Sequence, residues 1–426
     1  MEFLANKYKI IYESPDPQNI YAYTPGICVL RSGRYVFTND LGGAGTLDLL
    51  EATRIPPSPS GVRRLGQIFT SDDRGETWQL RAQRNFTHAR PFEAGDFVYV
   101  LGHAADLVIY RSTDGGQTWD DGHFLSEGER WHQSACNYWI EDGYITLVME
   151  VRENFEGEII SGWNVSSLAP VVMRARVDDD LTRRESWVFS NRIRFRDVVD
   201  EDMLELHGIP FYPTHKHVGE YPKGTLLTQM PGWLESNIVR IRDRKHYWYD
   251  PDGKTFHILM RAHTAGTGYC CLMKAVITEE GGREVITVMP EVNPSGRQVI
   301  FLPMPGGQMR FHILWDEVTQ LFWLLSEQAT DSMTRRELLS PERYNIPCDE
   351  RDRLQLSFSK NLVDWCFAAM VAKGDSEKQS RHYACMAIDG EDLLIVSRSG
   401  DTRTSSAHNT NLSTFHRLRD FRRLVY

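Results

Sequence analysis

Two copies of one short pattern constrain the fold of this chain more than any other feature. Residues 71–78 and 112–119 both read S-x-D-x-G-x-T-W, and each follows a short apolar segment. In a tight β-turn the Asp side chain can accept backbone hydrogen bonds, the Gly can adopt a positive φ, and the Trp can pack beneath a neighbouring strand. Each copy therefore predicts a hairpin inside a repeated β-sheet unit.

Apolar strands and polar turns recur along the chain in six such units. Each unit reads as an apolar strand, a tight turn, a second strand, and a third strand that leads toward a box-like turn. The units start near residues 26, 90, 134, 237, 311 and 384. We interpret them as an all-β, six-bladed β-propeller that forms a single domain over residues 1–426. Residues 424–426 are expected to pair with the strand 8–12 and close the ring.

Residues 190–232 break this rhythm and are interpreted as an insertion over one face, although a seventh blade is an alternative. The segment contains four prolines and the histidines His207, His215 and His217. The H-x-H spacing could bind a metal, but no carboxylate or thiolate cluster accompanies it. We expect these to be loop histidines, and we expect neither a metal nor a cofactor.

Composition narrows the partners and the compartment. The net charge is −10 and no run of Lys or Arg stands out, so nucleic acid is not an expected partner. No apolar run approaches the length of a membrane span, and the N-terminus lacks the apolar region of a signal peptide. Seven cysteines without a C-x-x-C pair are expected to be buried free thiols. The sequence therefore predicts a cytoplasmic protein that does not associate with membranes.

The propeller topology predicts where chemistry would gather. In each blade the first strand begins, and the second strand ends, near one mouth of the central channel. These positions are rich in ionisable side chains, whereas the strand interiors are apolar. A polar ring at one end of an apolar set of strands is typical of a concave binding site. The ring residues that we select are Asp40, His103, His132, Glu150, Glu235, Arg261, Arg310, His382, Tyr383 and Arg398.

The ring contains the groups that cleavage of a glycosidic bond requires. Glu150 and Glu235 are the candidate pair of carboxyl groups, one an acid and the other a nucleophile or base. His103 and His132 are candidate acid/base groups or hydrogen-bond donors. The other ring residues are candidate substrate-binding groups, with the arginines suited to a carboxylate. Trp233, in an expected loop beside Glu235, could stack on a sugar face.

The two turn motifs and the six-unit meander resemble the Asp-box propellers of the sialidase superfamily over almost the whole chain. Residues 405–417 are similar to bacterial sialidase-like proteins. The resemblance implies a glycan pocket at the centre of one propeller face. Sialidases use three arginines on the substrate carboxylate, a Tyr/Glu nucleophile pair and an Asp acid/base, and their first arginine lies in an R-I-P motif. Residues 21–27 contain Pro25 and Ile27 without a preceding Arg, so the resemblance implies a sialidase-like protein that lacks this first-blade arginine.

Three functions are compatible with these features. We favour an exo-acting glycoside hydrolase on small glycans, acidic ones included, with the oligosaccharide as its partner. An alternative is a polysaccharide lyase or histidine-dependent glycosidase, in which Arg neutralises a uronate and His103 or His132, with Tyr383, moves the proton. A third is a propeller that binds glycans without catalysis.

Overall fold

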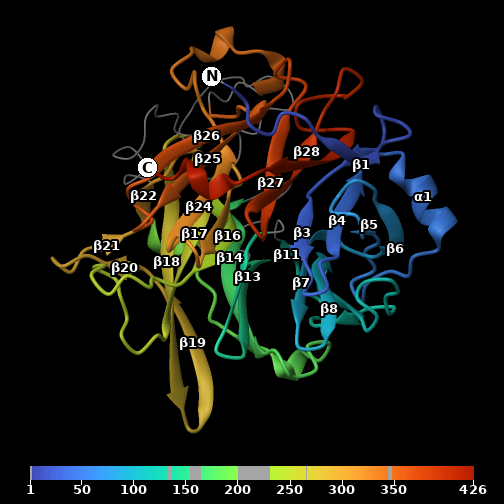
Figure 1. The fold of residues 1–426 in the computed structure, drawn as a ribbon. Helices are drawn as coiled ribbons and strands as arrows, with labels where there is room; N and C mark the ends of the chain where they lie inside the picture. The colour runs from blue at the N-terminus through green and yellow to red at the C-terminus, as the bar shows by residue number, and fades with distance from the viewer. Residues whose placement is uncertain (1, 133–135, 154–164, 200–230, 265, 344–347) are drawn as a thin grey trace.

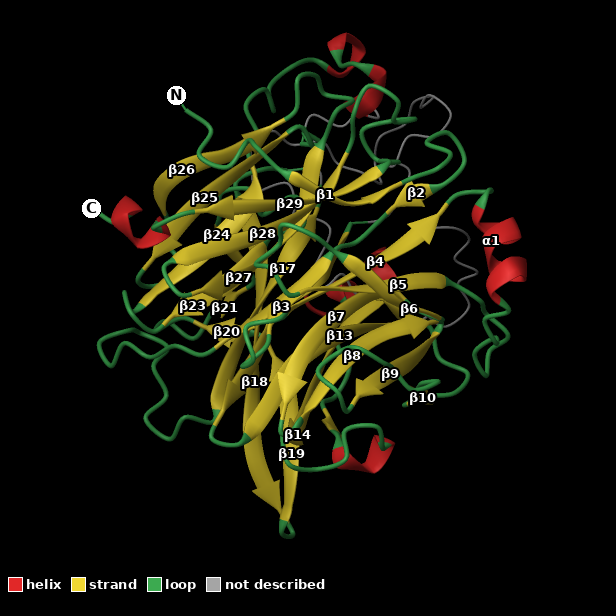
Figure 2. Ribbon diagram, turned by 45° about the vertical axis from the view of Figure 1, so that its right-hand side comes forward, coloured by secondary structure: helices red, strands yellow, loops and turns green. Residues whose placement is uncertain are grey.

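The computed structural model is a six-bladed β-propeller, as the sequence predicts. It describes residues 2–132, 136–153, 165–199, 231–264, 266–343 and 348–426. Six antiparallel sheets of four or five strands stand around a central axis (Figures 1 and 2). Three helical segments, α1 (Thr46–Thr53), α2 (Phe195–Val198) and the 3₁₀ helix η6 (Phe421–Leu424), lie between or beyond strands.

The first three blades follow one another along the chain. The first contains β2 (Tyr21–Ala22), β3 (Gly26–Val29), β4 (Tyr35–Gly42), β5 (Leu65–Ser71) and β6 (Gln79–Arg84). The second contains β7 (Thr87–Ala94), β8 (Phe97–Ala104), β9 (Asp106–Ser112) and β10 (His123–Phe124). The third contains β11 (Trp131–His132), β12 (Tyr138–Glu141), β13 (Tyr144–Arg152), β14 (Leu168–Arg176) and β15 (Val188–Phe189).

The last three blades complete the ring. The fourth contains β16 (Gly232–Val239), β17 (Thr255–His263), β18 (Tyr269–Glu280), β19 (Arg283–Met289) and β22 (Phe301–Pro303). The fifth contains β23 (His312–Asp316), β24 (Leu321–Glu327), β25 (Arg353–Ser359) and β26 (Cys366–Lys373). The sixth contains β27 (Arg381–Asp389), β28 (Asp392–Ser399), β29 (Leu412–Leu418) and β1 (Lys9–Glu13).

Short elements connect and extend these blades. The strands β20 (Glu291–Val292) and β21 (Gln298–Val299) form a separate ribbon, and β18 and β19 continue as a hairpin that projects from the ring (Figure 1). Further 3₁₀ helices are η1 (Val165–Ser167), η2 (Arg184–Ser186), η4 (Arg336–Leu338) and η5 (Pro341–Arg343). Among the described residues, no helix is long and apolar enough to cross a membrane.

The ring closes through the N-terminal strand, but with a different partner from the one expected. β1 pairs antiparallel with β29, from Lys9 opposite Phe415 to Glu13 opposite Leu412. The expected pairing of residues 424–426 with this strand is wrong. Asp420 adopts a left-handed φ of 49°, which turns the chain out of the sheet and into η6. The outer edge of β29 is thereby left to β1.

Neighbouring inner strands contact one another around the axis, so the ring is complete with six blades. The contacts run from β27 to β3, from β3 to β7, from β8 to β11, from β12 to β16, from β16 to β23 and from β23 to β27. Of the expected insertion, residues 190–199 and 231–232 are described, and Phe195 of α2 packs edge-to-face on Trp233 at 5.3 Å. His207, His215 and His217 lie outside the described residues.

The two S-x-D-x-G-x-T-W turns have the hydrogen bonds that their sequence predicts. Asp114 Oδ1 accepts from the backbone N–H groups of Gln117 and Thr118 at 2.9 Å each, and Oδ2 accepts from the Thr118 hydroxyl at 2.6 Å. Gly116 has a φ of 85°, and Trp119 is buried between the first two blades. These bonds lower the pKa of Asp114 to about 2, although burial opposes them.

We predict that Asp114→Ala lowers the stability of the second blade, because the backbone N–H groups of the turn lose their acceptor. Since the turn is exposed to water, the loss should be about 1 kcal/mol. Urea denaturation of the variant would measure it, with Asp121→Ala, an exposed change two residues beyond the turn, as the control. Equal midpoints for the two variants would contradict this role.

Candidate functional site

Three inner strands carry the same irregularity at one mouth of the channel. In β7, β16 and β27, two residues lie opposite a single residue of the second strand, which is a β-bulge. The first bulged residues are His88, Glu235 and Tyr383, with φ values of 52°, 61° and 50°. A left-handed backbone is uncommon for residues other than glycine and costs about 1–3 kcal/mol. The surrounding structure must therefore hold each bulge.

Buried carboxyl groups hold the bulges of the second and sixth blades. Asp40 Oδ1, at the end of the second strand of the first blade, accepts a hydrogen bond from the backbone N–H of His88 at 3.0 Å. Glu327 Oε1, at the end of the second strand of the fifth blade, accepts from the backbone N–H of Tyr383 at 2.8 Å. Each carboxyl group thus fixes a bulge in the next blade.

Glu150 does the same for the fourth blade. Its Oε1 accepts from the backbone N–H of Ser236 at 2.9 Å and from the Ser236 hydroxyl at 2.7 Å, directly after Glu235. Its Oε2 lies 3.3 Å from Nδ1 of His132. We call Asp40, Glu150 and Glu327 the brace carboxyls. All three are at most 1% exposed, so little water competes for the hydrogen bonds that hold the bulges.

The mouth consequently repeats every two blades. The first, third and fifth blades supply the brace carboxyls, and the second, fourth and sixth blades supply the bulged residues. The residues directly before the bulges are Thr87, Leu234 and His382. Near the end of the next strand, they pair with His103, Arg261 and Arg398, respectively. The second, fourth and sixth blades therefore each place one bulged side chain and one His or Arg side chain at the mouth.

Arg261 links two of the bulged residues across blades. Its Nη1 donates to the Tyr383 hydroxyl at 3.0 Å and lies 3.4 Å from Glu235 Oε2. Burial by itself would lower the pKa of Arg261, but Tyr383 and Glu235 raise it overall. Burial also raises the pKa of Tyr383, and Glu235 adds to that effect, so the phenol is protonated at neutral pH. Tyr383 is 9% exposed and Glu235 1%, so the tyrosine lies nearer to the opening.

Two more arginines flank Tyr383. The Arg351 guanidinium lies 5.8 Å from the centre of the Tyr383 ring and forms an ion pair with Asp349 at 2.8 Å. The Arg398 guanidinium lies 5.3 Å from the same ring and 4.1 Å from the Tyr23 ring. Arg261, Arg351 and Arg398 form what we call the arginine side of the mouth.

Three histidines occupy another part of the mouth, which we call the histidine side. The ring centres of His88, His103 and His132 are 5.0–6.0 Å apart. Burial, together with the neighbouring His132, holds the pKa of His88 and of His103 well below the usual value. Both rings are therefore uncharged at neutral pH. In the described residues, these three rings belong to no group of His, Cys, Asp and Glu arranged to hold a metal ion.

Two of the brace carboxyls retain a free oxygen. Among the described residues, Asp40 Oδ2 and Glu327 Oε2 have no hydrogen-bond partner. Burial raises the pKa of each carboxyl group to about 7, although the bonded N–H groups and nearby arginines oppose it. Each group is thus close to half protonated at neutral pH and can give or take a proton.

The other residues selected from the sequence lie behind the mouth. Arg310 donates to the Ala384 carbonyl and is 1% exposed, so it supports β27 from within the channel. His382 is fully buried, with Nδ1 3.1 Å from Nη1 of Arg351. Neither side chain reaches the opening.

The structure corrects the predicted position of Trp233. It was expected in a loop, but it belongs to β16, and its indole is fully buried in the hydrophobic core. Its Nε1 donates to the Leu168 carbonyl at 3.0 Å. It therefore stabilises the fourth blade and offers no face to a sugar.

Sequence reasoning missed Arg351 and passed over His88. Arg351 lies in the long connection between β24 and β25, outside the strand positions from which the ring was chosen. His88 stands at a strand start, where its signal was a histidine two residues before a buried arginine. Glu327 ends β24, but its role as a brace depends on the bulge in the next blade and has no local signal in the sequence.

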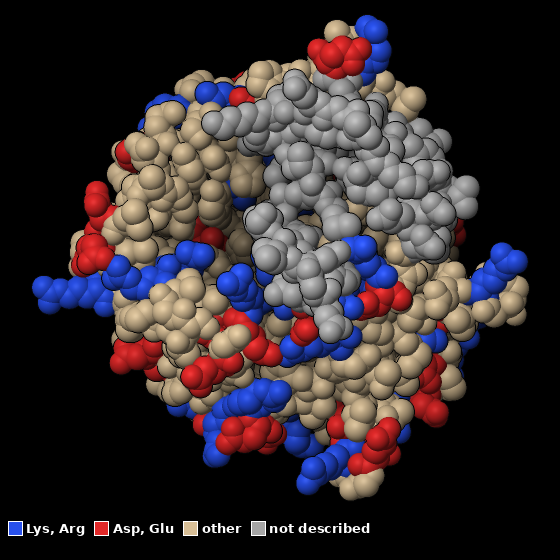
Figure 3. Space-filling view, turned by 180° about the vertical axis from the view of Figure 1, so that it is seen from behind, with Lys and Arg blue, Asp and Glu red and all other residues tan. Residues whose placement is uncertain are grey.

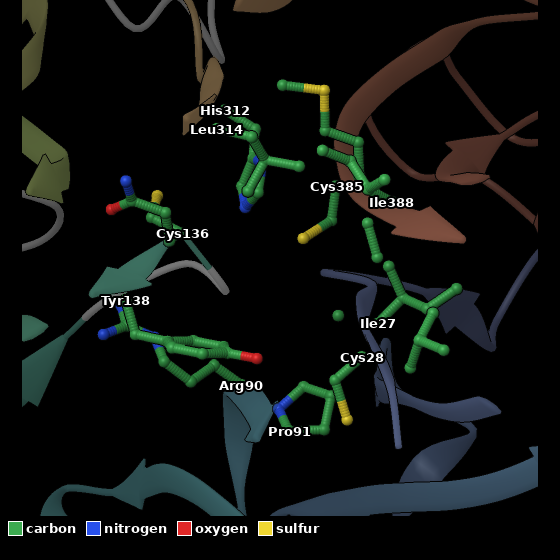
Figure 4. A pocket seen from close by; sticks show the side chains of 15 residues that line it. Ile27, Cys28, Arg90, Pro91, Cys136, Tyr138, His312, Leu314, Cys385 and Ile388 are labelled. Atoms are coloured by element: carbon green, nitrogen blue, oxygen red, sulfur yellow. The ribbon is translucent and has the colours of Figure 1, made fainter. Parts of the chain in front are cut away.

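Below the mouth, the channel contains a cavity of about 220 Å³. Inner strands of five blades line it, and Figure 4 shows Cys136, His312 and Cys385 around it. All seven cysteines are free thiols, and six of them are buried, as expected. On the outside, charged side chains of both signs border a hollow beside the grey segments in Figure 3.

No protein-family model matches the sequence, and no curated protein matches it. Among solved structures, the fold is similar to Hadza microbial sialidase Hz136, with a TM-score of 0.53, 12% identity, and coverage of 97% of this chain and 68% of that one. A protein of unknown function from Dyadobacter fermentans has a TM-score of 0.51 and 10% identity, with coverage of 97% and 99%. The NanB sialidase from Streptococcus pneumoniae has a TM-score of 0.50 and 10% identity, with coverage of 97% and 71%. The chain therefore has a sialidase-like propeller fold.

The raised pKa values predict how stability depends on pH. The folded protein binds protons at Asp40 and Glu327 more tightly than the unfolded chain does. Their contribution is therefore complete below about pH 4 and is lost as the pH rises through about 7, at no more than about 4 kcal/mol for Asp40 and about 3 kcal/mol for Glu327. The double variant Asp40→Asn/Glu327→Gln keeps both oxygen acceptors and should flatten this slope in urea denaturation between about pH 4 and 8. An unchanged slope, equal to that of Asp121→Asn, would contradict the assignment.

Proposed function

We propose that this protein is an exo-acting glycoside hydrolase that releases a sugar carrying an acidic group from small glycans. The observation that carries the proposal is the contact of Arg261 with both Tyr383 and Glu235, at 3.0 and 3.4 Å. It joins a nucleophile, a base and a cation at the mouth of a propeller whose fold is shared with sialidases. Those neighbours are similar in fold only, so the site carries the argument.

The arginine side supports an anionic substrate. Arg261 is balanced by Glu235, and Arg351 by Asp349. Arg398 forms no ion pair with a carboxylate among the described residues, and it donates instead to the His408 carbonyl. Burial lowers its pKa, and Arg351 adds repulsion, although Tyr23, Tyr383 and Asp40 oppose both effects. A substrate carboxylate would supply a negative charge in direct contact with Arg398 and could be bound bidentately.

We propose that this chain lacks the first-blade arginine of sialidases and that Tyr23 lies near the corresponding position. The Tyr23 ring lies against Arg398, whose guanidinium is 4.1 Å from the ring centre. We propose that Arg398, from the sixth blade, takes the role of that arginine and, with Arg261 and Arg351, supplies the third positive charge that binds the substrate carboxylate. A different direction of approach to the carboxylate would then select a different acidic sugar from the one that sialidases bind.

We propose that Tyr383 is the nucleophile and Glu235 its base. The Tyr383 oxygen, nearer to the opening, would attack the anomeric carbon while Glu235 removes the phenolic proton, and the bond to the leaving oxygen would break. Arg261 would stabilise the negative charge that develops on the phenolic oxygen. Water would then release the sugar from the tyrosine.

Asp40 is our candidate for the acid that protonates the leaving oxygen, in place of Glu150. Asp40 Oδ2 has no partner among the described residues, and the pKa near 7 leaves a proton to donate. Both oxygens of Glu150, by contrast, are engaged by Ser236 and His132. We therefore assign Glu150 to positioning His132 and the fourth-blade bulge, and we keep His103 and His132 as substrate-binding groups.

A lyase is the second candidate, and the uncharged imidazoles of His88 and His103 favour it. A neutral imidazole such as that of His103 can accept the proton next to a uronate carboxyl group, while the arginines neutralise the carboxylate. The two reactions differ in their products, because elimination leaves a carbon–carbon double bond that absorbs in the ultraviolet. Hydrolysis adds water and leaves no such bond.

We predict that Glu235→Gln and Tyr383→Phe each lower kcat at least about 100-fold on an acidic glycoside, because each removes a reacting group. The measurement is the initial rate of sugar release on a panel of uronic acid and nonulosonic acid glycosides, with ultraviolet absorbance followed in the same samples. Glu284→Gln and Tyr99→Phe, both distant from the mouth, are the matched controls. Full turnover by either mouth variant would refute its assignment, and an ultraviolet signal would favour the lyase.

A further inference from the structure

The mouth repeats three times, but the proposed chemistry uses only two of its three bulged residues. His88 occupies in the second blade the place that Glu235 and Tyr383 occupy in the fourth and sixth. Its φ of 52° is strained for a histidine, and Asp40 holds its backbone N–H in the same manner. Strained backbone held by its surroundings is concentrated at functional sites. The repeat therefore indicates that His88, like Glu235 and Tyr383, has a functional role.

The chemistry of the histidine side differs from that of the arginine side. His88 and His103 are uncharged, so each imidazole offers one hydrogen-bond donor and one acceptor. Nδ1 of His88 is buried and has no hydrogen-bond partner among the described residues. His132 is held by Glu150 at 3.3 Å, which fixes its ring. Such a set of groups matches sugar hydroxyls, which also donate and accept, better than an anion.

Asp40 lies between the two sides. Its Oδ1 holds His88, and its carboxyl group is close enough to Arg398 for the arginine to lower its pKa. An acid at this boundary would protonate the oxygen that joins a sugar on the arginine side to a sugar on the histidine side. The leaving group would then rest on the histidines.

We infer that His88, His103 and His132 form a second subsite for the neutral, hydroxyl-rich sugar of the leaving group, and that His88 determines its specificity. This inference rests on the proposed function, and it extends the substrate to an acidic sugar linked to a neutral one. The arginine side would bind the acidic sugar, and the histidine side would bind the neutral one.

The test compares two substrates that share the same acidic sugar. One carries a neutral sugar as leaving group and the other carries methanol. His88→Ala should lower kcat/KM about 10- to 100-fold on the disaccharide and less than about 3-fold on the methyl glycoside. His88→Asn, which tolerates a left-handed backbone and keeps a donor and an acceptor, should recover most of the loss. His123→Ala, on the exposed edge of the same blade, is the control. Equal losses on both substrates, or none, would overturn the inference.

A binding measurement distinguishes a failure of this inference from a failure of the proposed function. By saturation-transfer NMR, the wild type should bind a neutral disaccharide, and His88→Ala should lose that binding while it keeps its affinity for the acidic monosaccharide. This result without any hydrolysis would remove the proposed function and leave the subsite standing. A wild type that hydrolyses the acidic glycosides but shows no binding of neutral sugars would overturn the subsite alone. The thermal midpoint of His88→Ala, compared with that of His88→Asn, shows whether the fold is intact.

Discussion

The hydrogen bond from a buried carboxyl group to the backbone of the next blade is the interaction on which this mouth depends. Asp40, Glu150 and Glu327 each accept such a bond, at 3.0, 2.9 and 2.8 Å. A buried N–H without an acceptor costs about 1–3 kcal/mol, which is similar to the cost of a left-handed residue. Without the brace, a bulge would bear both costs. Because each brace carboxyl belongs to the preceding blade, the packing of one blade on the next determines the direction in which His88, Glu235 and Tyr383 project.

Burial then sets the charge of each group according to its partners. Arg261 stays charged because Glu235 and Tyr383 accompany it, whereas burial lowers the pKa of His88 and His103 and neighbouring cationic groups lower it further. The result is a mouth with a cationic side, with the uncharged imidazoles of His88 and His103 on another side, and with a titratable carboxyl group, Asp40, between them. In a site of low dielectric constant such a division acts strongly on a ligand, since water screens little of it.

The sequence revealed the architecture more readily than the site, for a physical reason. Turn chemistry is local, so two octapeptides and the strand periodicity were enough to count six blades and to place the polar ring at the strand ends. A bulge at a residue other than glycine has no local signature, because it is stabilised by a carboxyl group from another blade. This is why the hydrogen bond from Glu150 to the fourth-blade bulge could not be foreseen. Trp233 was expected in a loop because the expected strand began at residue 237, whereas β16 begins at Gly232. Arg351 was missed because it lies in a connection whose path only the folded chain defines.

The central claim is that the arginine side and Tyr383 face the same sugar. A crystal structure of the Glu235→Gln variant soaked with an acidic glycoside tests it most directly. The account predicts the sugar carboxylate within hydrogen-bond distance of Arg261, Arg351 and Arg398, with the anomeric carbon about 3–3.5 Å from the Tyr383 oxygen. A carboxylate bound among His88, His103 and His132, or a sugar bound away from this mouth, would contradict it.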